Sequence, residues 1–370
     1  MLKDTKFLDG LRGLAAIYVL IHHARWLLTE SYSLRIDKTF IGKFLTYTLS
    51  MFRFGHEVVI FFFVLSGFVI HLSVLKAKEK ALPFQIKKYF NKRINRIYPA
   101  FIFALLLTLI LDYLGKNVFH LEVYTKGSKY YQLFLTETNF SVTAFFTNII
   151  NIQGLTSSTP VFGTNAALWS LSYEWWFYMF YPLFYTMRNR SISLTLALQI
   201  VLFLTVNYLI RVDFPIISAL FSKMLIWWLG TILAEIYFQN IKLNLRYLST
   251  LILAIPLAVL FFFNDRIIGD LLWGIGFIGL LGYLLSIKNT NLFIKILSSL
   301  KGTASFSYTL YLIHVPIIYM AHAYLIKKYN GVLPTTYFWV FILSSILIVV
   351  SSLLARRLEN LVLIKIKKTT

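Results

Sequence analysis

The stretch Phe7–Arg25 reads "FLDGLRGLAAIYVLIHHAR", an apolar run of membrane-spanning length that carries ionisable side chains near both ends. About 20 predominantly apolar residues suffice to cross a bilayer as a helix. Similar runs recur from one end of the chain to the other, so the sequence predicts an all-α, polytopic integral membrane protein. Ionisable groups inside such a run are costly, and they therefore mark functional candidates.

The composition leads to the same class of protein. The chain has 370 residues, of which 58% are hydrophobic and only 14% are charged. It contains no cysteine, which excludes disulfides, thiolate catalysis and Cys-ligated metals. The formal net charge is +21. In a membrane protein an excess of Lys and Arg indicates first of all how the chain is oriented in the membrane, and we expect no nucleic-acid partner.

We predict about ten membrane spans of roughly 20 residues each. They lie at residues 11–29, 54–75, 97–114, 169–187, 191–210, 215–238, 247–263, 270–287, 305–326 and 335–354. The stretch Ser141–Ile152 is too short and too polar to span, and we assign it to a long loop. With a cytoplasmic N-terminus, the inner segments carry roughly twice as many Lys and Arg residues as the outer ones, which favours cytoplasmic termini. The sequence has no separate soluble domain, so residues 1–370 are predicted to form a single transmembrane domain in the cell membrane.

The first span places an arginine and a histidine on one helical face. Arg12 and His23 are eleven residues apart, which brings them within about 20° of one line along a helix. The helical rise separates them by roughly 16 Å. Asp9 lies about 40° from the same line, whereas His22 points about 80° away. The alternative interpretation is that Arg12 anchors the helix at the headgroups and His23 bonds a neighbouring helix.

A second pair of arginines enters the third span from the cytoplasmic side, in "NKRINRIYPAF". Arg93 and Arg96 are three residues apart and project from one helical face. Two guanidinium groups at this spacing suit a phosphate-bearing ligand. The alternative is membrane anchoring by snorkelling, which is our interpretation of Lys87, Lys88 and Lys92.

A carboxylate lies in the fourth span, within "ALWSLSYEWWFYMFYP". Glu174 is at about the same depth below the outer surface as His23. A carboxylate can orient an imidazole and raise its basicity, which makes the pair a candidate general base. The alternatives are a protonated core carboxyl or a pair with another span.

Further candidates are of second rank. Asp9 accompanies Arg12, Glu57 and Ser66 occur in "GHEVVIFFFVLSGFVI", and His314 lies near the middle of the ninth span. Ser66-Gly67 does not form a nucleophile elbow, and we interpret both residues as small side chains that allow close helix approach. His314 is either functional or a packed core histidine. The histidines lie on different spans without an HExxH-like pair, so the sequence predicts no metal site.

Five stretches, in this order, resemble the acyltransferase 3 family of membrane-bound acyltransferases: "FLDGLRGLAAIYVLIHHA", "FFFVLSGFVI", "RINRIYPA", "LWSLSYEWWFYMFYP" and "SYTLYLIHVP". The similarity runs along nearly the whole chain, and the usual ten spans of the family agree with the count above. The resemblance implies transfer of an acyl group, usually acetyl, from acyl-CoA to a hydroxyl. The acceptors are commonly cell-envelope carbohydrates or lipid-linked saccharides.

The resemblance also assigns residues. The family's first-span histidine follows its arginine by eleven residues, which corresponds to His23, and its arginine pair corresponds to Arg93 and Arg96. The position three residues before Phe63 is often acidic in relatives but is Ile60 here; the nearest acid, Glu57, lies one turn earlier. Some members carry a fused extracytoplasmic esterase-like domain, and because this chain ends at "KIKKTT" we expect a stand-alone enzyme.

These expectations combine into a mechanism. Arg12, Arg93 and Arg96 would hold the phosphates of acetyl-CoA, and its pantetheine arm would cover the roughly 16 Å to His23. His23 would deprotonate the acceptor hydroxyl or carry the acyl group itself, with Glu174 orienting it. The main alternative is a proton-coupled transporter that uses the same buried groups as a relay. The ionisable residues crowd the first half of the chain, without the repeat symmetry common in transporters, which disfavours that alternative.

Overall fold

A computed structural model describes residues 4–30, 39–126, 141–261 and 265–367 of the chain. These residues form helices joined by turns and loops, and no strand occurs among them. The prediction of an all-α protein is confirmed. The physical reason is that a segment surrounded by lipid must satisfy its backbone hydrogen bonds internally, as a helix does.

The contacts divide the chain into two compact units, each built from segments that are distant in sequence. Unit 1 comprises Met1–Arg12, His56–Arg93 and Ser170–Lys301. Unit 2 comprises Gly13–Gly55, Ile94–Trp169 and Gly302–Thr370. The two boundaries near Arg12 and Arg93 fall inside helices, so α1 and α4 each contribute to both units.

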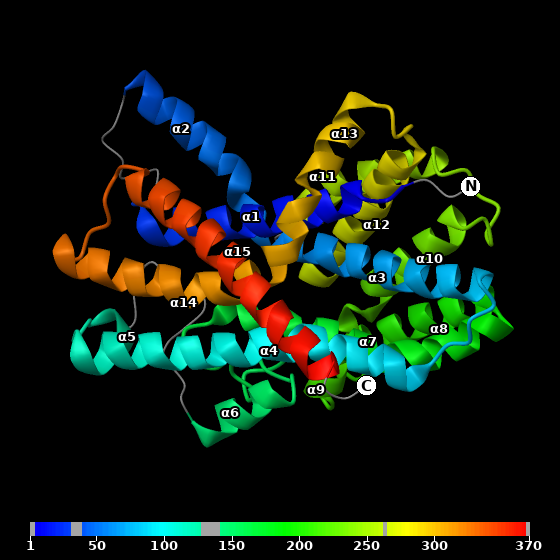
Figure 1. The fold of residues 1–370 in the computed structure, drawn as a ribbon, viewed down its shortest axis with the longest axis horizontal. Coiled ribbons are helices and arrows are strands. Elements are labelled where there is room, and N and C mark those ends of the chain that lie inside the picture. Colours follow the sequence, from blue (N-terminus) through cyan, green and yellow to red (C-terminus); the bar gives the residue numbers. More distant parts are fainter. Residues whose placement is uncertain (1–3, 31–38, 127–140, 262–264, 368–370) are drawn as a thin grey trace. The chain divides into compact units, whose positions relative to one another are not determined.

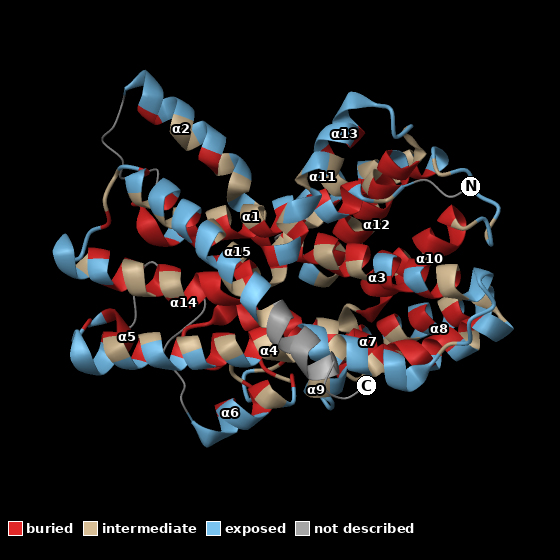
Figure 2. Ribbon diagram, viewed as in Figure 1, coloured by how far each residue is buried: buried red, intermediate tan, exposed pale blue. Residues whose placement is uncertain are grey.

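Unit 1 consists mainly of helices from the middle of the chain (Figure 1). They are α3 (Gly55–Glu79), α7 (Trp169–Arg190), α8 (Ile192–Leu204), α9 (Pro215–Ser222), α10 (Met224–Tyr237), α11 (Ala254–Phe261), α12 (Arg266–Ser286) and α13 (Leu292–Ser299), with the π-helical turn η5 (Thr205–Leu209) and the 3-10 helix η6 (Tyr247–Leu253). Helix α12 packs against η6, α10 and α11. Helix α10 is buried along most of its length (Figure 2).

Two glycines let α3 and α10 approach each other closely within unit 1. A Cβ atom at Gly67 would collide with the backbone carbonyl of Trp227, and one at Gly230 would collide with the carbonyl of Val64. Small residues at such contacts are typical of helix pairs in membranes. The interpretation of Gly67 as a close-approach residue is confirmed, whereas Ser66 also makes polar contacts that are described below.

Unit 2 contains most of the first helix and the last two helices of the chain (Figure 1). Its helices are α1 (Phe7–Leu28), α2 (Phe40–Ser50), α4 (Ile86–Tyr113), α5 (Val123–Lys126), α6 (Val142–Ile149), α14 (Ala304–Lys328) and α15 (Phe338–Lys367), with the short elements η2 (Met51–Arg53), η3 (Leu114–Val118), η4 (Ala166–Leu168) and η7 (Leu300–Thr303). Helices α14 and α15 pack against each other, and α14 also contacts η4 and α5. Helix α2 is exposed along most of its length (Figure 2).

Each of the ten predicted spans coincides with helical structure over its described residues, and the end of the span 247–263, residues 262 and 263, lies outside them. Seven helical stretches among the described residues are long and apolar enough to cross a membrane. Three predicted spans fall outside these seven. Helix α1 carries Asp9, Arg12 and Arg25, the mean hydropathy of α7 is low, and the helical stretch Tyr247–Leu260 is apolar but shorter than a full span. The number of spans and the orientation of the termini therefore stay predictions. Helix α6 has only eight residues, which confirms that the segment around it is too short to span.

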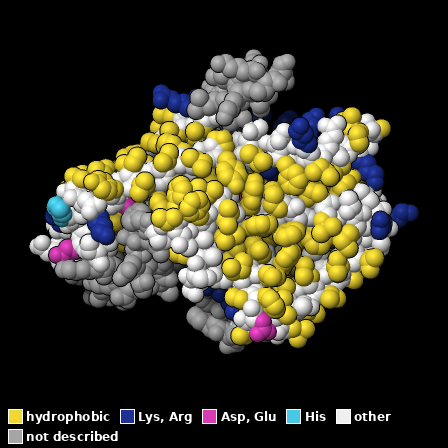
Figure 3. All heavy atoms as spheres, turned by 90° about the horizontal axis from the view of Figure 1, so that it is seen from below, with side chains coloured by type: hydrophobic (Ala, Val, Ile, Leu, Met, Phe, Trp, Pro, Cys, Tyr) yellow, Lys and Arg dark blue, Asp and Glu magenta, His cyan; other side chains and the backbone are white. Residues whose placement is uncertain are grey.

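Many large hydrophobic side chains are exposed on the outside of these helices. On α8, Leu194 is 62% exposed and Leu204 is 50% exposed. Figure 3 shows a face on which hydrophobic side chains cover much of the surface. An apolar exterior on helices of this length is what a protein surrounded by lipid requires.

Candidate active site

Helix α1 runs without interruption through Arg12 and His23. The prediction that the two residues share one face of a helix required a continuous helix of this kind. The Arg12 guanidinium lies 3.7 Å from the carboxylate of Asp9, one turn earlier. Asp9 is thus the ion-pair partner of Arg12, at the polar end of this helix.

His23 is hydrogen-bonded to a second histidine within unit 2. Its Nδ1 atom lies 3.1 Å from Nε2 of His314, and the ring centroids are 5.0 Å apart. His314 comes from α14, is 1% exposed, and is separated from His23 by 291 residues of sequence. His23 itself is half-buried. The structure therefore brings together a first-rank and a second-rank candidate.

The neighbouring carbonyl groups determine the tautomer of each imidazole in its neutral form. Nδ1 of His314 lies 2.7 Å from the carbonyl oxygen of Tyr311, so it must donate, and Nε2 is left as an acceptor. Nδ1 of His23 lies 3.0 Å from the carbonyl oxygen of Val19, so it too carries the hydrogen and donates to Val19 and to His314. The lone pair of His23 is therefore on Nε2. Such an imidazole can accept a proton at a defined atom.

A proline in α14 leaves a backbone carbonyl near His314 free to accept a hydrogen bond from outside the helix. Pro316 lacks an N–H group, which leaves the carbonyl of Leu312 without its helical partner. The side-chain amide of Asn165 donates to this carbonyl at 2.8 Å. Asn165 is completely buried, and its neighbour Thr164 is fixed by two hydrogen bonds to Asp112 of α4, at 2.7 and 2.8 Å. The loop before α7 thus fixes the turn of α14 that carries His314.

His22 has a different environment from its neighbour. Its Nδ1 atom donates to the carbonyl oxygen of Phe52 at 2.8 Å, and its ring stacks on Trp26. A side chain at Gly55 would collide with the same ring. His22 therefore ties α1 to the turn η2, whereas His23 is bonded to the neighbouring helix α14.

Glu174 lies in a polar cluster of unit 1. Its carboxylate accepts a hydrogen bond from the hydroxyl of Tyr178 and a longer one, of 3.4 Å, from Ser66. The Ser66 hydroxyl is also 3.0 Å from that of Tyr178 and accepts from the indole N–H of Trp227 at 3.4 Å. The structure thus gives Glu174 partners within unit 1 and His23 partners within unit 2. The pairing of Glu174 with His23 stays a prediction.

The arginine pair lies on consecutive turns of α4. Arg93 is half-buried, and its guanidinium carbon is 4.5 Å from the ring centroid of Tyr89 and 5.8 Å from that of Tyr178. Arg96 is exposed. The two aromatic rings hold the guanidinium of Arg93 by cation–π attraction, and its role in binding a donor stays a prediction.

The last second-rank candidate, Glu57, is 4% exposed at the start of α3. Its neighbour His56 donates from Nε2 to Asp270 of α12 at 2.7 Å, and Lys223 donates to the same carboxylate at 2.6 Å. This cluster joins α3, α12 and the break between α9 and α10 within unit 1. Among the described residues, no group of three or more His, Cys, Asp or Glu side chains is placed to hold a metal ion.

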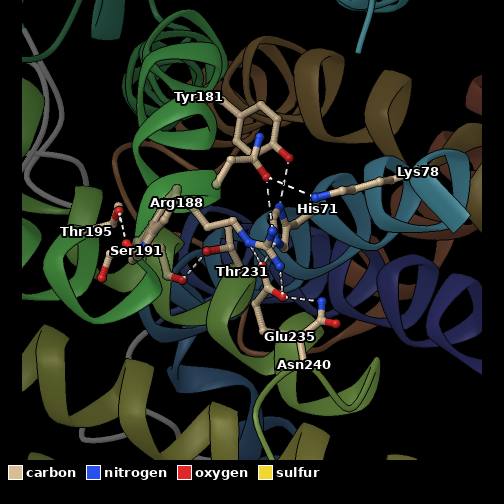
Figure 4. Close-up of polar contacts among 11 residues, drawn as sticks. His71, Lys78, Tyr181, Arg188, Ser191, Thr195, Thr231, Glu235 and Asn240 are labelled. Carbon is tan, nitrogen blue, oxygen red and sulfur yellow. Dashed lines mark hydrogen bonds and ion pairs between the residues drawn. The ribbon is translucent and has the colours of Figure 1, made fainter. Parts of the chain in front are cut away.

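Sequence reasoning missed several buried ionisable residues. His71, Arg188 and Glu235 form a hydrogen-bonded network in unit 1 (Figure 4), and His322 donates to the carbonyl of Leu27 at 2.7 Å in unit 2. His71 and Glu235 stand inside apolar runs. The argument that singled out His23, that an ionisable group in such a run is a candidate, would have found both.

Fold and site together define an all-α, multi-pass membrane protein with a histidine pair between its helices. A family model described as an acyltransferase domain matches residues 5–357, and the chain therefore belongs to the acyltransferase 3 family. The resemblance seen in the five sequence stretches is confirmed.

Individual relatives are distant. The chain is 23% identical over 350 residues to the O-acetyltransferase OatA of Staphylococcus aureus, and this match covers 86% of the chain and 51% of the relative. It is 27% identical over 149 residues to an uncharacterized protein of Haemophilus influenzae, covering 38% of the chain and 55% of the relative. The chain thus spans about half the length of the curated relatives that it matches. No solved structure shows a significant similarity to it.

Proposed function

We propose that the protein is a membrane-bound O-acyltransferase that moves an acetyl group from cytoplasmic acetyl-CoA to a hydroxyl of a cell-envelope carbohydrate or lipid-linked glycan. The observation that carries the proposal is the hydrogen bond from His23 to His314, which leaves Nε2 of His23 as the basic atom. Family membership and the similarity to a staphylococcal O-acetyltransferase support the reaction class. In this proposal residues 1–370 form one acyltransferase domain in the cell membrane.

His23 acts as the general base. Its Nε2 takes the proton from the acceptor hydroxyl while the oxygen attacks the thioester carbonyl. The carbon–sulfur bond then breaks, the acetyl ester forms, and CoA leaves as the thiolate. The proton on His23 passes to this thiolate, which restores the neutral imidazole. Nε2 of His314 accepts a hydrogen bond from the Nδ1–H group of His23 and stabilises the imidazolium while it exists, as the third member of a catalytic triad does.

The arginines bind the donor. CoA is anionic, and Arg93 and Arg96 offer forked charge-assisted hydrogen bonds to its phosphates, with Arg12 as a third contact. Glu174 is the second catalytic candidate. In the proposed mechanism it orients the imidazole of His23 and raises its basicity, and its carboxylate accepts hydrogen bonds from Ser66 and Tyr178.

The proposal is tested with purified protein in lipid nanodiscs. We expect release of free CoA thiol from acetyl-CoA when an envelope glycan fraction is present, together with base-labile acetate on that fraction. A transporter would show neither product, and their absence with well-folded protein would contradict the proposal.

A further inference from the structure

A buried ionic network in unit 1 has no part in the mechanism above. The Glu235 carboxylate accepts hydrogen bonds from Nε and a terminal nitrogen of Arg188, from Asn240 at 2.7 Å and from Nε2 of His71 at 2.6 Å (Figure 4). Glu235 is 1% exposed and His71 is completely buried. Buried ion pairs seldom stabilise a protein more than apolar residues of the same volume would. Stability alone is therefore a weak reason for this network, and its neighbours indicate another.

The network fixes the hydroxyl of Tyr181. Arg188 already compensates the charge of Glu235, so a neutral His71 satisfies every partner: Nε2–H donates to Glu235, and Nδ1 accepts from the Tyr181 hydroxyl at 2.8 Å. Figure 4 shows His71 between Tyr181 and Glu235. Since the carboxylate, the imidazole and the hydroxyl are all buried and bonded, the Tyr181 ring has one orientation available.

Tyr181 in turn holds Tyr89. The two rings are stacked, with centroids 5.4 Å apart and planes inclined by 25°. The Tyr89 hydroxyl donates to the backbone carbonyl of Tyr178 at 3.2 Å. This carbonyl is available because Pro182, four residues later in α7, has no N–H group to offer it. Tyr89 is therefore fixed both through its ring face and through its hydroxyl.

Tyr89 carries the guanidinium of Arg93 on its ring. Arg93 follows by four residues on the same face of α4, and its guanidinium carbon lies 4.5 Å from the ring centroid. A cation over the face of a tyrosine ring is attracted by the ring electrons, and a guanidinium has five N–H donors, more than one neighbour occupies. An arginine that is already stacked loses less rotamer freedom on binding than a mobile one.

We propose that Tyr89 is a positioning residue for the acyl donor: it holds Arg93 in the orientation that binds a donor phosphate, and Tyr181, His71 and Glu235 hold Tyr89. This inference rests on the proposed function, in which Arg93 is a donor contact. It adds to that function a series of contacts that runs from the buried Glu235 through His71, Tyr181 and Tyr89 to the guanidinium of Arg93.

The test compares two donors, acetyl-CoA and S-acetylpantetheine, which has the same thioester but no phosphate. We expect Tyr89→Leu to raise the KM for acetyl-CoA about tenfold, as loss of a partly buried cation–π contact would. Its kcat with acetyl-CoA and its kcat/KM with S-acetylpantetheine should stay at the wild-type values. Tyr89→Phe keeps the ring and should restore most of the acetyl-CoA affinity.

Tyr185→Leu is the matched control. Tyr185 also stacks on Tyr181, with centroids 5.8 Å apart, whereas Arg93 lies over Tyr89 and Tyr178. Its loss perturbs the same aromatic cluster and should leave the ratio between the two donors unchanged. Tyr181→Phe is the second test, because it removes only the hydroxyl that binds His71. It should raise the acetyl-CoA KM about threefold, and it serves if Tyr89→Leu does not fold.

Arg93→Ala, measured in the same assays, distinguishes a failure of Arg93 as a phosphate contact from a failure of Tyr89 as its positioning residue. If Arg93→Ala weakens both donors equally or neither, its assignment as a phosphate contact fails. If it weakens acetyl-CoA alone while the Tyr89→Leu and Tyr181→Phe variants bind both donors like the wild type, the positioning role of Tyr89 is overturned. An equal loss with both donors in Tyr89→Leu would also overturn it, since that is the result of general destabilisation.

Discussion

At the scale of single residues, the proposed chemistry depends on which nitrogen of His23 carries no hydrogen. The helical-face argument separated His23 from His22, and the contacts separate them again: His22 donates to Phe52, whereas His23 donates to Val19 and to His314. The sequence could not predict the partnership with His314, because periodicity orders residues within one helix and says nothing of contacts across 291 residues.

His314→Ala tests the role of the second imidazole. It removes the acceptor of the Nδ1 hydrogen of His23 and leaves the general base in place, so kcat should fall at least about tenfold, less than after loss of the base itself. His314→Gln offers an acceptor again and should recover part of the loss. Steady-state rates with acetyl-CoA would measure both variants. Wild-type kcat in His314→Ala would show that the hydrogen bond has no catalytic role.

The arginine pair is tested by donor affinity. Arg93→Ala or Arg96→Ala should weaken binding of acetyl-CoA by more than about tenfold, since a charge-assisted hydrogen bond contributes ~1.5–3 kcal/mol. Arg→Lys should restore the affinity only in part, because lysine lacks the planar fork. Calorimetric titration gives the dissociation constants. Unchanged affinity in both alanine variants would leave membrane anchoring as the explanation of the pair.

At the scale of the elements, apolar runs and glycines in the sequence correspond directly to helices and their contacts. Every predicted span coincides with helical structure over its described residues, because run length and hydropathy decide helix formation in a membrane. The breaks were not predictable in the same way. Helix α9 ends at Ser222 and α10 begins at Met224. Lys223, between them, donates a hydrogen bond from its ammonium group to the carboxylate of Asp270. Tertiary contacts of this kind override local pattern.

The packing of α3 against α10 gives a stability prediction. Gly67→Ala and Gly230→Ala each place a methyl group against a backbone carbonyl of the opposite helix. Each should destabilise the fold by about 1–3 kcal/mol, the usual cost of overpacking. Gly302→Ala is the matched control, since no atom lies within 4 Å of the added Cβ. Thermal unfolding in detergent measures all three. A Gly67→Ala protein as stable as Gly302→Ala would contradict the close approach.

At the scale of the whole molecule, the topology and the equal depth of Glu174 and His23 are predictions from the sequence. Lysine and arginine counts predict cytoplasmic termini, and helix geometry predicts that His23 and Glu174 lie at equal depth. Both predictions concern the position of the chain relative to the membrane. The absence of cysteine makes the topology easy to test.

Single cysteines can be introduced without background labelling. Lys80→Cys lies in the loop between α3 and α4, which the charge distribution places in the cytoplasm, and Ser157→Cys lies in the predicted outer loop before α7. Both positions are exposed. A membrane-impermeant maleimide added to intact cells should label only Ser157→Cys. Labelling of Lys80→Cys in intact cells would contradict the predicted orientation.

The central claim is that His23 is the general base of an envelope O-acetyltransferase, and mass spectrometry of envelope glycans tests it most directly. Cells should produce the wild type, His23→Ala or His22→Ala at equal membrane levels. Glycans from wild-type and His22→Ala cells should carry base-labile acetyl groups, because the Nδ1 atom of His22 is bonded to the carbonyl of Phe52 and its ring stacks on Trp26, so it is not the proposed base. Those from His23→Ala cells should carry at least ~10²-fold fewer, the usual loss on removing a positioned base. Acetylation at the wild-type level in His23→Ala cells would contradict the account.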